Sequence, residues 1–228
     1  MPQPYIRKFR SLSPERSPAD YVLLEDFEDG ISAWTTSGNN ASRIFTRDTA
    51  QAWRGLASVR VETGATTPAA GNWIGILRGT GNLEETRVMI SLRVRYTSSS
   101  NQTLLRVHPI IGIRGSTRMW EPYFEIRRTA TTTTIAVMNP DLSLTTIFTS
   151  TWMIPTLRWL EAKLIVNLVT GRYESLIFAG RQHNLIAFPM LDTTRGDFVT
   201  DELQIYLDTL EAANKIIHLD DIMMGTIS

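Results

Sequence analysis

The chain alternates apolar and polar residues over many short runs, which is the pattern of β-strands that bury one face. In residues 87–96, Val88, Ile90, Leu92 and Val94 would point to one side and the more polar residues to the other. Similar short runs cover residues 58–62, 123–128, 133–138, 160–168 and 173–178. No long segment repeats with the helical period, so the pattern predicts a protein built from strands.

Turn residues separate these runs, and the breaks fall at residues 97–101, 139–141, 170–171 and 179–180. Residues 162–180 are therefore predicted to form a hairpin that turns at 169–172. A helix could compete only within residues 200–215, but Leu203, Ile205 and Leu207 alternate as in a strand. Short strands without helices between them predict an all-β fold, an antiparallel jelly-roll or β-sandwich that residues 21–228 form as one domain.

The first twenty residues differ from the rest, because they hold four of the ten prolines and several basic side chains. Such a composition favours an extended arm over part of a core. The arm is either a tail without a function or a segment that docks on a partner. In the second case the docking residues are Arg7, Lys8, Arg10 and Arg16.

Overall charge and cysteine content exclude several kinds of function. The 23 basic and 23 acidic residues cancel, which argues against nucleic acid or an anionic membrane as partner. There is no cysteine, and therefore no disulfide, thiolate metal site or cysteine nucleophile. The chain starts without the apolar stretch of a secretory signal, so we expect synthesis in a host cytoplasm without export.

Five motifs follow one another in an order that indicates a family of folds. They are DFEDGISAW, RGLASVRVE, NWIGILR, WLEAKLIVNLVTGRYESLIFAG and IIHLDDIMMG. This order resembles the jelly-roll and concanavalin-like β-sandwiches found among carbohydrate-binding modules and laminin-G-like domains. The resemblance covers about residues 21–227, and its motifs are short, so it implies a fold more than a ligand.

In many such jelly-rolls the first and last strands lie side by side and share a structural calcium ion (Ca²⁺). Carried over by position, the resemblance implies that Glu28 and Asp220 are its ligands, with backbone carbonyls completing the shell. The alternative is that these acids are solvated, since Asp29 and Gly30 also form an ordinary turn dipeptide. Calcium is the one cofactor that the sequence suggests.

The strongest case for catalysis is the segment EPYFE, where Glu121 and Glu125 would share one face of a strand. On a regular strand they would lie about 13 Å apart, too far for the carboxyl pair of a glycosidase. His108, His183 and His218 are scattered and indicate neither a zinc site nor a general base. We therefore expect a protein that is not an enzyme and has no catalytic residue.

Aromatic residues offer a second kind of site. Trp73, Trp120 and Tyr123 could form a platform on which sugar rings stack. The alternative is that these side chains fill the core or a subunit interface, as tryptophans in sandwiches often do.

These observations together predict a non-catalytic structural protein of a virion, such as a capsid decoration or tail component of a bacteriophage. Its partners would be a capsid or other virion protein and further copies of itself, and glycans are a further candidate. The acid-rich stretch 192–221 would offer the basic arm a complementary surface on a neighbouring copy. A free-standing carbohydrate-binding module or lectin is the alternative, and a concanavalin-like glycosidase or lyase is a distant third.

Overall fold

The computed structural model describes residues 20–80, 86–97, 102–113, 117–151, 154–194 and 201–227. These residues form seventeen strands, β1 to β17, and no helix. No helix in this part of the chain could therefore be long and apolar enough to cross a membrane. Residues 1–19 of the predicted arm, with Arg7, Lys8, Arg10 and Arg16, lie outside the described residues, and Asp20, the last residue of the predicted arm, is the first residue of β1.

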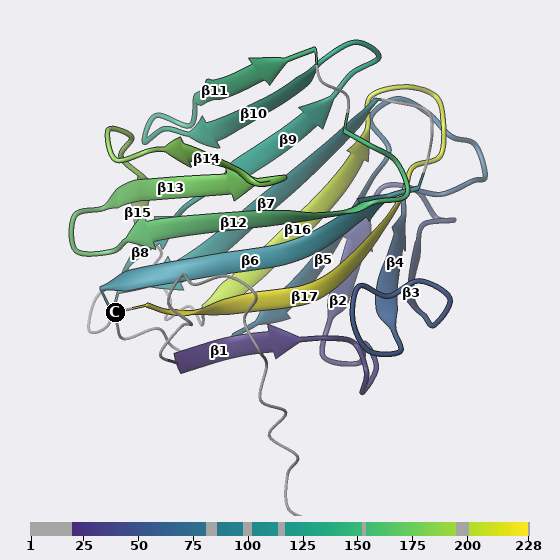
Figure 1. Ribbon diagram of the computed structural model, residues 1–228, viewed down its shortest axis with the longest axis horizontal. Helices are drawn as coiled ribbons and strands as arrows, with labels where there is room; N and C mark the ends of the chain where they lie inside the picture. The colour runs from purple at the N-terminus through teal and green to yellow at the C-terminus, as the bar shows by residue number, and fades with distance from the viewer. Residues whose placement is uncertain are drawn as a thin grey trace, which may run out of the picture.

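Two antiparallel sheets make up the molecule, and in Figure 1 the first lies in front of the second. In the order of their pairing, the strands of the first sheet are β14 (Arg181–Asn184), β13 (Arg172–Phe178), β12 (Trp159–Asn167), β6 (Arg87–Tyr96), β17 (Ile216–Thr226), β4 (Ser58–Glu62) and β3 (Ile44–Asp48), with β1 (Asp20–Glu25) also paired to β17. Those of the second are β11 (Leu144–Ser150), β10 (Thr133–Met138), β9 (Phe124–Arg128), β7 (Thr103–Gly112), β16 (Glu202–Thr209), β5 (Trp73–Gly79) and β2 (Thr35–Gly38). In addition, β8 (Arg118–Glu121) pairs with β7, and β15 (Leu191–Thr194) pairs with β8. The predicted all-β, antiparallel jelly-roll sandwich is confirmed.

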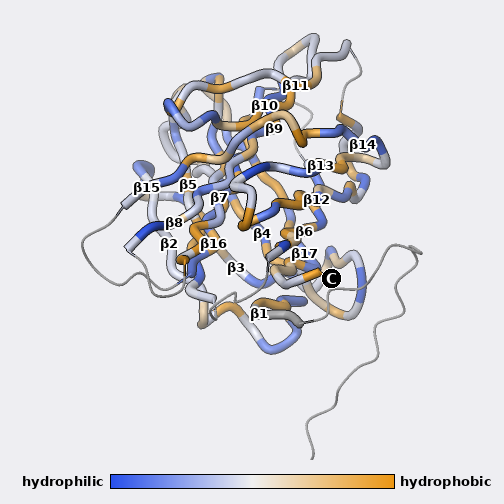
Figure 2. Tube along the Cα trace, turned by 90° about the vertical axis from the view of Figure 1, so that its left-hand side faces the viewer, coloured by the Kyte–Doolittle hydropathy of each residue, from blue (hydrophilic) through white to orange (hydrophobic). Residues whose placement is uncertain are grey.

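The core lies between the sheets, where the apolar residues of the alternating strands meet. Val88, Ile90, Leu92 and Val94 of β6 are fully buried there, as the sequence predicts. In β16 the alternate residues Leu203, Ile205 and Leu207 are buried in the same way, so a strand and not a helix forms. Figure 2 shows the hydrophobic stretches along the strands in the middle of the molecule.

The two ends of the described chain meet in the first sheet. β1 pairs antiparallel with β17, which confirms the expectation from the resemblance. β17 also pairs with β6, and a bulge shifts that register between Asp220 and Met223. The predicted hairpin at residues 169–172 is confirmed as the connection between β12 and β13.

One strand prediction is wrong, and it matters for function. Glu121 and Glu125 do not share a regular strand, because β8 ends at Glu121 and β9 begins at Phe124. The intervening Pro122 cannot donate a backbone hydrogen bond, which is consistent with a break in strand pairing here. The separation of about 13 Å expected along a regular strand therefore does not apply to this pair.

Candidate functional site on the outer face of the second sheet

Four adjacent strands of the second sheet, β9, β7, β16 and β5, turn polar side chains away from the core. Arg106 of β7 lies opposite Glu125 of β9 on one side and Tyr206 of β16 on the other. His108, two residues further along β7, lies opposite Gln204. Successive strand residues point to opposite faces, and the residues between these, such as Val107 and Ile205, are buried in the core. We call the following set the polar face cluster: Arg106, His108, Glu121, Tyr123, Glu125, Gln204, Tyr206 and Asp208.

Arg106 is held in place by Asp208 of the neighbouring strand. The Arg106 Nε and Nη2 groups donate to the two Asp208 carboxylate oxygens over 3.0 and 2.5 Å. Burial raises the pKa of Asp208 even though Arg106 acts in the opposite direction. A guanidinium has five N–H donors, so this pairing leaves donors of Arg106 for another acceptor.

Tyr206 lies across the surface of β5, where Gly75 makes room for it. A Cβ atom at Gly75 would come within 2.6 Å of the Tyr206 ring. The ring also packs against Trp73 at 5.9 Å and under the Arg106 guanidinium at 5.2 Å. Its hydroxyl donates to Gln204 Oε1 over 2.6 Å. Burial, and then the charge of nearby Glu202, raise the pKa of Tyr206, so the phenol stays protonated at neutral pH.

His108 has a carboxylate partner that orients its ring. Its Nε2 atom lies 3.0 Å from Glu121 Oε2, and Thr193 donates to the other oxygen of that carboxylate over 2.5 Å. An ionised carboxylate accepts only, so in the neutral ring Nε2 carries the proton and Nδ1 keeps the basic lone pair. This arrangement is suitable for a general base.

Tyr123 connects the His108 side of the cluster with Glu125. Its ring meets the His108 ring edge-on at 5.8 Å, and its hydroxyl donates to Glu125 Oε2 over 3.0 Å. Burial and the Glu125 charge raise the pKa of Tyr123. Glu121 and Glu125 are both 6% exposed. The cluster thus combines a cation, an imidazole, two phenols and three buried or half-buried carboxyl groups.

The structure separates the three residues of the predicted sugar platform. Trp73 on β5 and Tyr123, directly before β9, both lie on the outer face of the second sheet. Three strand spacings separate β9 from β5, so about 14 Å of sheet lies between the two residues. Trp120 packs partly against the core, with its ring beside Gly171. Sugar binding by the three residues stays a prediction.

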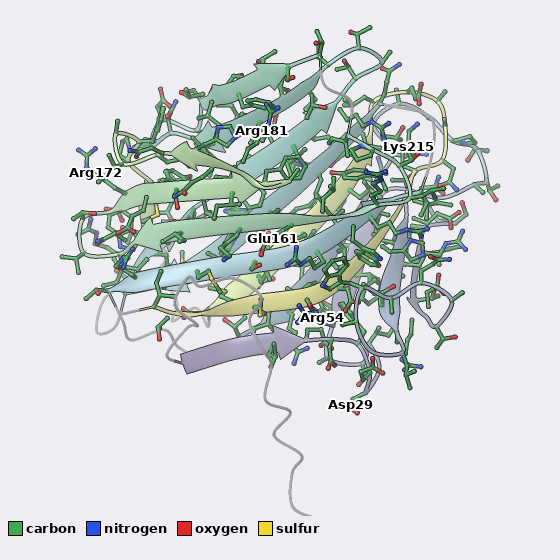
Figure 3. All side chains as sticks on the ribbon, viewed as in Figure 1. Asp29, Arg54, Glu161, Arg172, Arg181 and Lys215 are labelled. Carbon is green, nitrogen blue, oxygen red and sulfur yellow. The ribbon has the colours of Figure 1, made fainter. Side chains whose placement is uncertain are left out.

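The two predicted calcium ligands face one chain segment, residues 53–57. Asp220 Oδ2 accepts the backbone N–H of Trp53 over 2.7 Å, and Glu28 Oε1 accepts that of Leu56 over 2.5 Å. Arg54 of this segment lies in front of β17 and β1 in Figure 3.

Backbone N–H groups already serve as partners of both carboxylates, which fits an anchor for this segment better than a cation site. Among the described residues, no group of three or more acids or histidines could hold a metal ion. Calcium binding by Glu28 and Asp220 therefore stays a prediction, and no chemistry in this protein is derived from it.

Sequence reasoning missed most of the polar face cluster. The signal was present in residues 202–209, where Gln204, Tyr206 and Asp208 alternate with the buried residues. Such residues look like ordinary solvent-facing positions until the neighbouring strand is known. His108 looks isolated in the sequence, because Glu121 is thirteen residues away and reaches it only through the pairing of β8 with β7.

No family model and no curated protein matches this sequence. Among solved structures, the chain is similar to a carbohydrate esterase of the Shiga toxin-encoding bacteriophage phi24B, with 16% identity, a TM-score of 0.62 and coverage of 92% of this chain and 99% of that one. It is similar to the alginate lyase vAL-1 from a Chlorella virus, with 9% identity, a TM-score of 0.61 and coverage of 91% and 100%. A mutant of the alginate lyase Aly36B in complex with an alginate trisaccharide matches with 12% identity, a TM-score of 0.54 and coverage of 90% and 98%.

These comparisons correct one prediction and confirm another. From the sequence we expect a protein that is not an enzyme, and this inference from the fold is wrong. The same sandwich occurs, over nearly the full length of both chains compared, in an esterase and in two lyases. At such low identity the likeness shows the fold alone. The chain has the jelly-roll β-sandwich fold of carbohydrate-active proteins, as the order of its motifs indicates.

Proposed function

We propose that this protein is a carbohydrate-active enzyme that holds a polysaccharide on the outer face of the second sheet and cleaves it by β-elimination beside a uronate. One observation carries the proposal: Arg106, His108, Gln204 and Tyr206 lie side by side on β7 and β16. They supply a cation, a base, an amide and a phenol within one patch. The similar folds of two alginate lyases support this reaction class by analogy.

Elimination from a uronate needs three kinds of group. The C5 proton becomes acidic when the charge of the adjacent carboxylate is compensated, which is the role of Arg106 and of the Gln204 amide. His108, through Nδ1, takes that proton, and the electron pair forms a double bond between C5 and C4. The bond from C4 to the glycosidic oxygen breaks, and the Tyr206 hydroxyl gives that oxygen its proton. The products are an unsaturated uronate end and a new reducing end.

Glu121 does not touch the substrate in this scheme and is a positioning residue. Its carboxylate fixes the His108 ring and its tautomer through the 3.0 Å contact with Nε2. Tyr206 suits the acid role because its raised pKa keeps the phenol protonated until the leaving oxygen develops charge.

The test is incubation with a panel of uronate polysaccharides, including alginate and polygalacturonate, while unsaturated ends are followed by ultraviolet absorbance. His108→Gln and Tyr206→Phe should each lower kcat by about 10²-fold or more, the usual contribution of a general base or acid. His183→Gln is the matched histidine control, since His183 packs on Phe148 away from the cluster. Absence of unsaturated product from every polysaccharide, or product formation that both variants leave unchanged, would refute the proposal.

Glycoside hydrolysis is a second candidate, favoured by the burial of Glu121 and Glu125 on this face. Their placement on separate strands removes the spacing argument against such a pair. The same incubation distinguishes the two reactions. Hydrolysis would release reducing ends without unsaturation, and Glu121→Gln or Glu125→Gln would abolish that release.

We further propose that the enzyme works as part of a bacteriophage particle, as a homo-oligomer that residues 1–20 attach to a capsid or tail protein. The positive charge of this segment supports the proposal. Two of the three similar structures named above also come from viruses. Capsid and portal genes beside the gene for this protein would support the assignment, whereas a polysaccharide-utilisation cluster would favour a free enzyme or lectin.

A further inference from the structure

We propose that a depression on the outer face of the first sheet is a second carbohydrate-binding site, which takes a neutral sugar residue. It has a volume of about 590 Å³ and is lined by residues of β6, β12, β13 and β14 and of the loop after β14. Ligand pockets commonly measure roughly 300–1,000 Å³. This face points to the viewer in Figure 3, where Arg172 and Arg181 mark the first residues of β13 and β14. It is opposite the polar face cluster, so the inference does not depend on the proposed reaction.

A β-bulge shapes the depression. Ile165 pairs with Ser175, but Val166 pairs with Tyr173, so Glu174 is an extra residue on β13. Bulges of this kind redirect a side chain and often occur beside binding sites. Here the bulge places the Glu174 side chain on the same outer surface as Ser175, within the lining of the depression.

Glu174 is held rigidly in this position. Arg87 Nε lies 3.0 Å from both of its carboxylate oxygens, Arg87 Nη2 donates to Oε2 over 2.5 Å, and Asn167 donates to Oε1 over 3.2 Å. Burial works against ionisation of Glu174, but these hydrogen bonds lower its pKa below the ordinary value. Each carboxylate oxygen already accepts two of these contacts, so Glu174 and Arg87 form a rigid polar pair within the lining, beside the groups that remain to bind a sugar.

The remaining lining combines polar and apolar groups. Ser175 supplies a hydroxyl, and Gln182 and Asn184 supply amides from the exposed strand β14. Amides both donate and accept, as sugar hydroxyls do. Ile165 is half-buried beneath them, and Ile186 is 63% exposed at the rim. These two isoleucines offer an apolar surface to the C–H face of a sugar ring.

The charge of the lining decides between classes of sugar. Arg87 and Glu174 are the charged residues that line the depression, and they neutralise each other. A uronate would bring its carboxylate toward Glu174, and Arg87, the cation of the lining, is already paired with that residue, which costs free energy. The site is therefore suited to a neutral residue of a polysaccharide, unlike the Arg106 side of the sandwich.

The experiment is methyl NMR of the isoleucine-labelled full chain, titrated with glucose, galactose, mannose and N-acetylglucosamine, and separately with galacturonate and glucuronate. At least one neutral sugar should shift the Ile165 and Ile186 methyl signals and leave those of Ile74 and Ile76, in the core, unchanged. Gln182→Ala should weaken this binding about tenfold, the effect of losing a hydrogen-bonded amide. Gln51→Ala, in the connection between β3 and β4 and outside both sites, is the matched amide control and should bind the sugar as the wild type does.

Several results would overturn the inference. These are no shift with any neutral sugar, equal shifts with the uronates, or shifts that Gln182→Ala leaves unchanged. If Gln182→Ala does not fold, Ile186→Ala replaces it, with Ile165 as the reporter. Loss of cleavage in His108→Gln with sugar binding retained would separate the two sites, so failure of one proposal does not imply failure of the other.

Discussion

Asp220 is a buried carboxyl group whose ionised form lowers the stability of the fold. Its side chain has no exposed surface, and it accepts backbone N–H groups of Trp53 and Asp221. Burial, and to a smaller extent the nearby Asp221 charge, raise the pKa of Asp220 to about 6, while these hydrogen bonds act in the opposite direction. The Asp220 carboxylate anchors the segment at residues 53–57. Burial of this group in its ionised form lowers the free energy of unfolding.

A pH-dependent stability follows from this residue. Because its folded pKa lies above the unfolded value, the native state binds more protons between about pH 4 and pH 6, so stability falls as pH rises through that window. Asp220→Asn removes this contribution, and its free energy of unfolding relative to the wild type should rise by about 2–3 kcal/mol from pH 4 to pH 7. Urea unfolding of both proteins in chelator measures it, and a difference that is constant with pH would contradict the prediction.

The Glu121 carboxylate gives a second prediction at this scale. Glu121→Gln keeps the size of the side chain but loses the charge that orients His108 Nε2. We expect a lower kcat with little change in KM, together with an altered pH profile of kcat, because the ring changes its preferred tautomer. A merely structural role would lower stability and leave the pH profile in place. Glu161→Gln, on β12 of the first sheet, is the control.

At the scale of the element, β5 determines how Tyr206 is presented. Gly75 and Gly79 lie on this strand, but only a Cβ at Gly75 would meet the tyrosine ring, whereas nothing lies within 4 Å of one at Gly79. The absence of a side chain at one strand position thus sets the position of a side chain on the next strand.

This pair of glycines makes a matched test. Gly75→Ala should displace the Tyr206 ring and lower kcat by about 10²-fold, the effect of a misplacement near 1 Å. Gly79→Ala should leave activity unchanged. Thermal melts show whether both variants fold. Full activity in Gly75→Ala would mean that the position of Tyr206 does not matter for the reaction.

At the scale of the whole molecule, the sandwich is closed by the pairing of β1 with β17. Leu23 of this first strand is 3% exposed and belongs to the core. Residues 1–19 precede the described strands, so deleting them should leave the melting temperature and the activity unchanged while abolishing attachment to the particle. If the truncated protein still binds its particle at normal occupancy, the arm is not what attaches the protein.

Calcium provides another test on this scale. If an ion joins Glu28 and Asp220, it binds the native state alone, and melts in calcium and in chelator should differ by several degrees. If the backbone N–H partners of these carboxylates are sufficient, the two melts coincide. Asp29→Asn, which changes a turn acid outside the pair, is the control.

The sequence by itself determined the class of fold, because the burial of one strand face imposes an alternation that survives in the order of residues, as in Val88 to Val94 and Leu203 to Leu207. It also determined the β12–β13 hairpin, whose turn is local. The candidate site depended on tertiary structure. Arg106 and Asp208 are 102 residues apart and become partners through the strand order β9, β7, β16 and β5. The polar half of an alternating strand looks the same whether it faces solvent or a substrate, and the pairing of distant strands decides which of its residues meet.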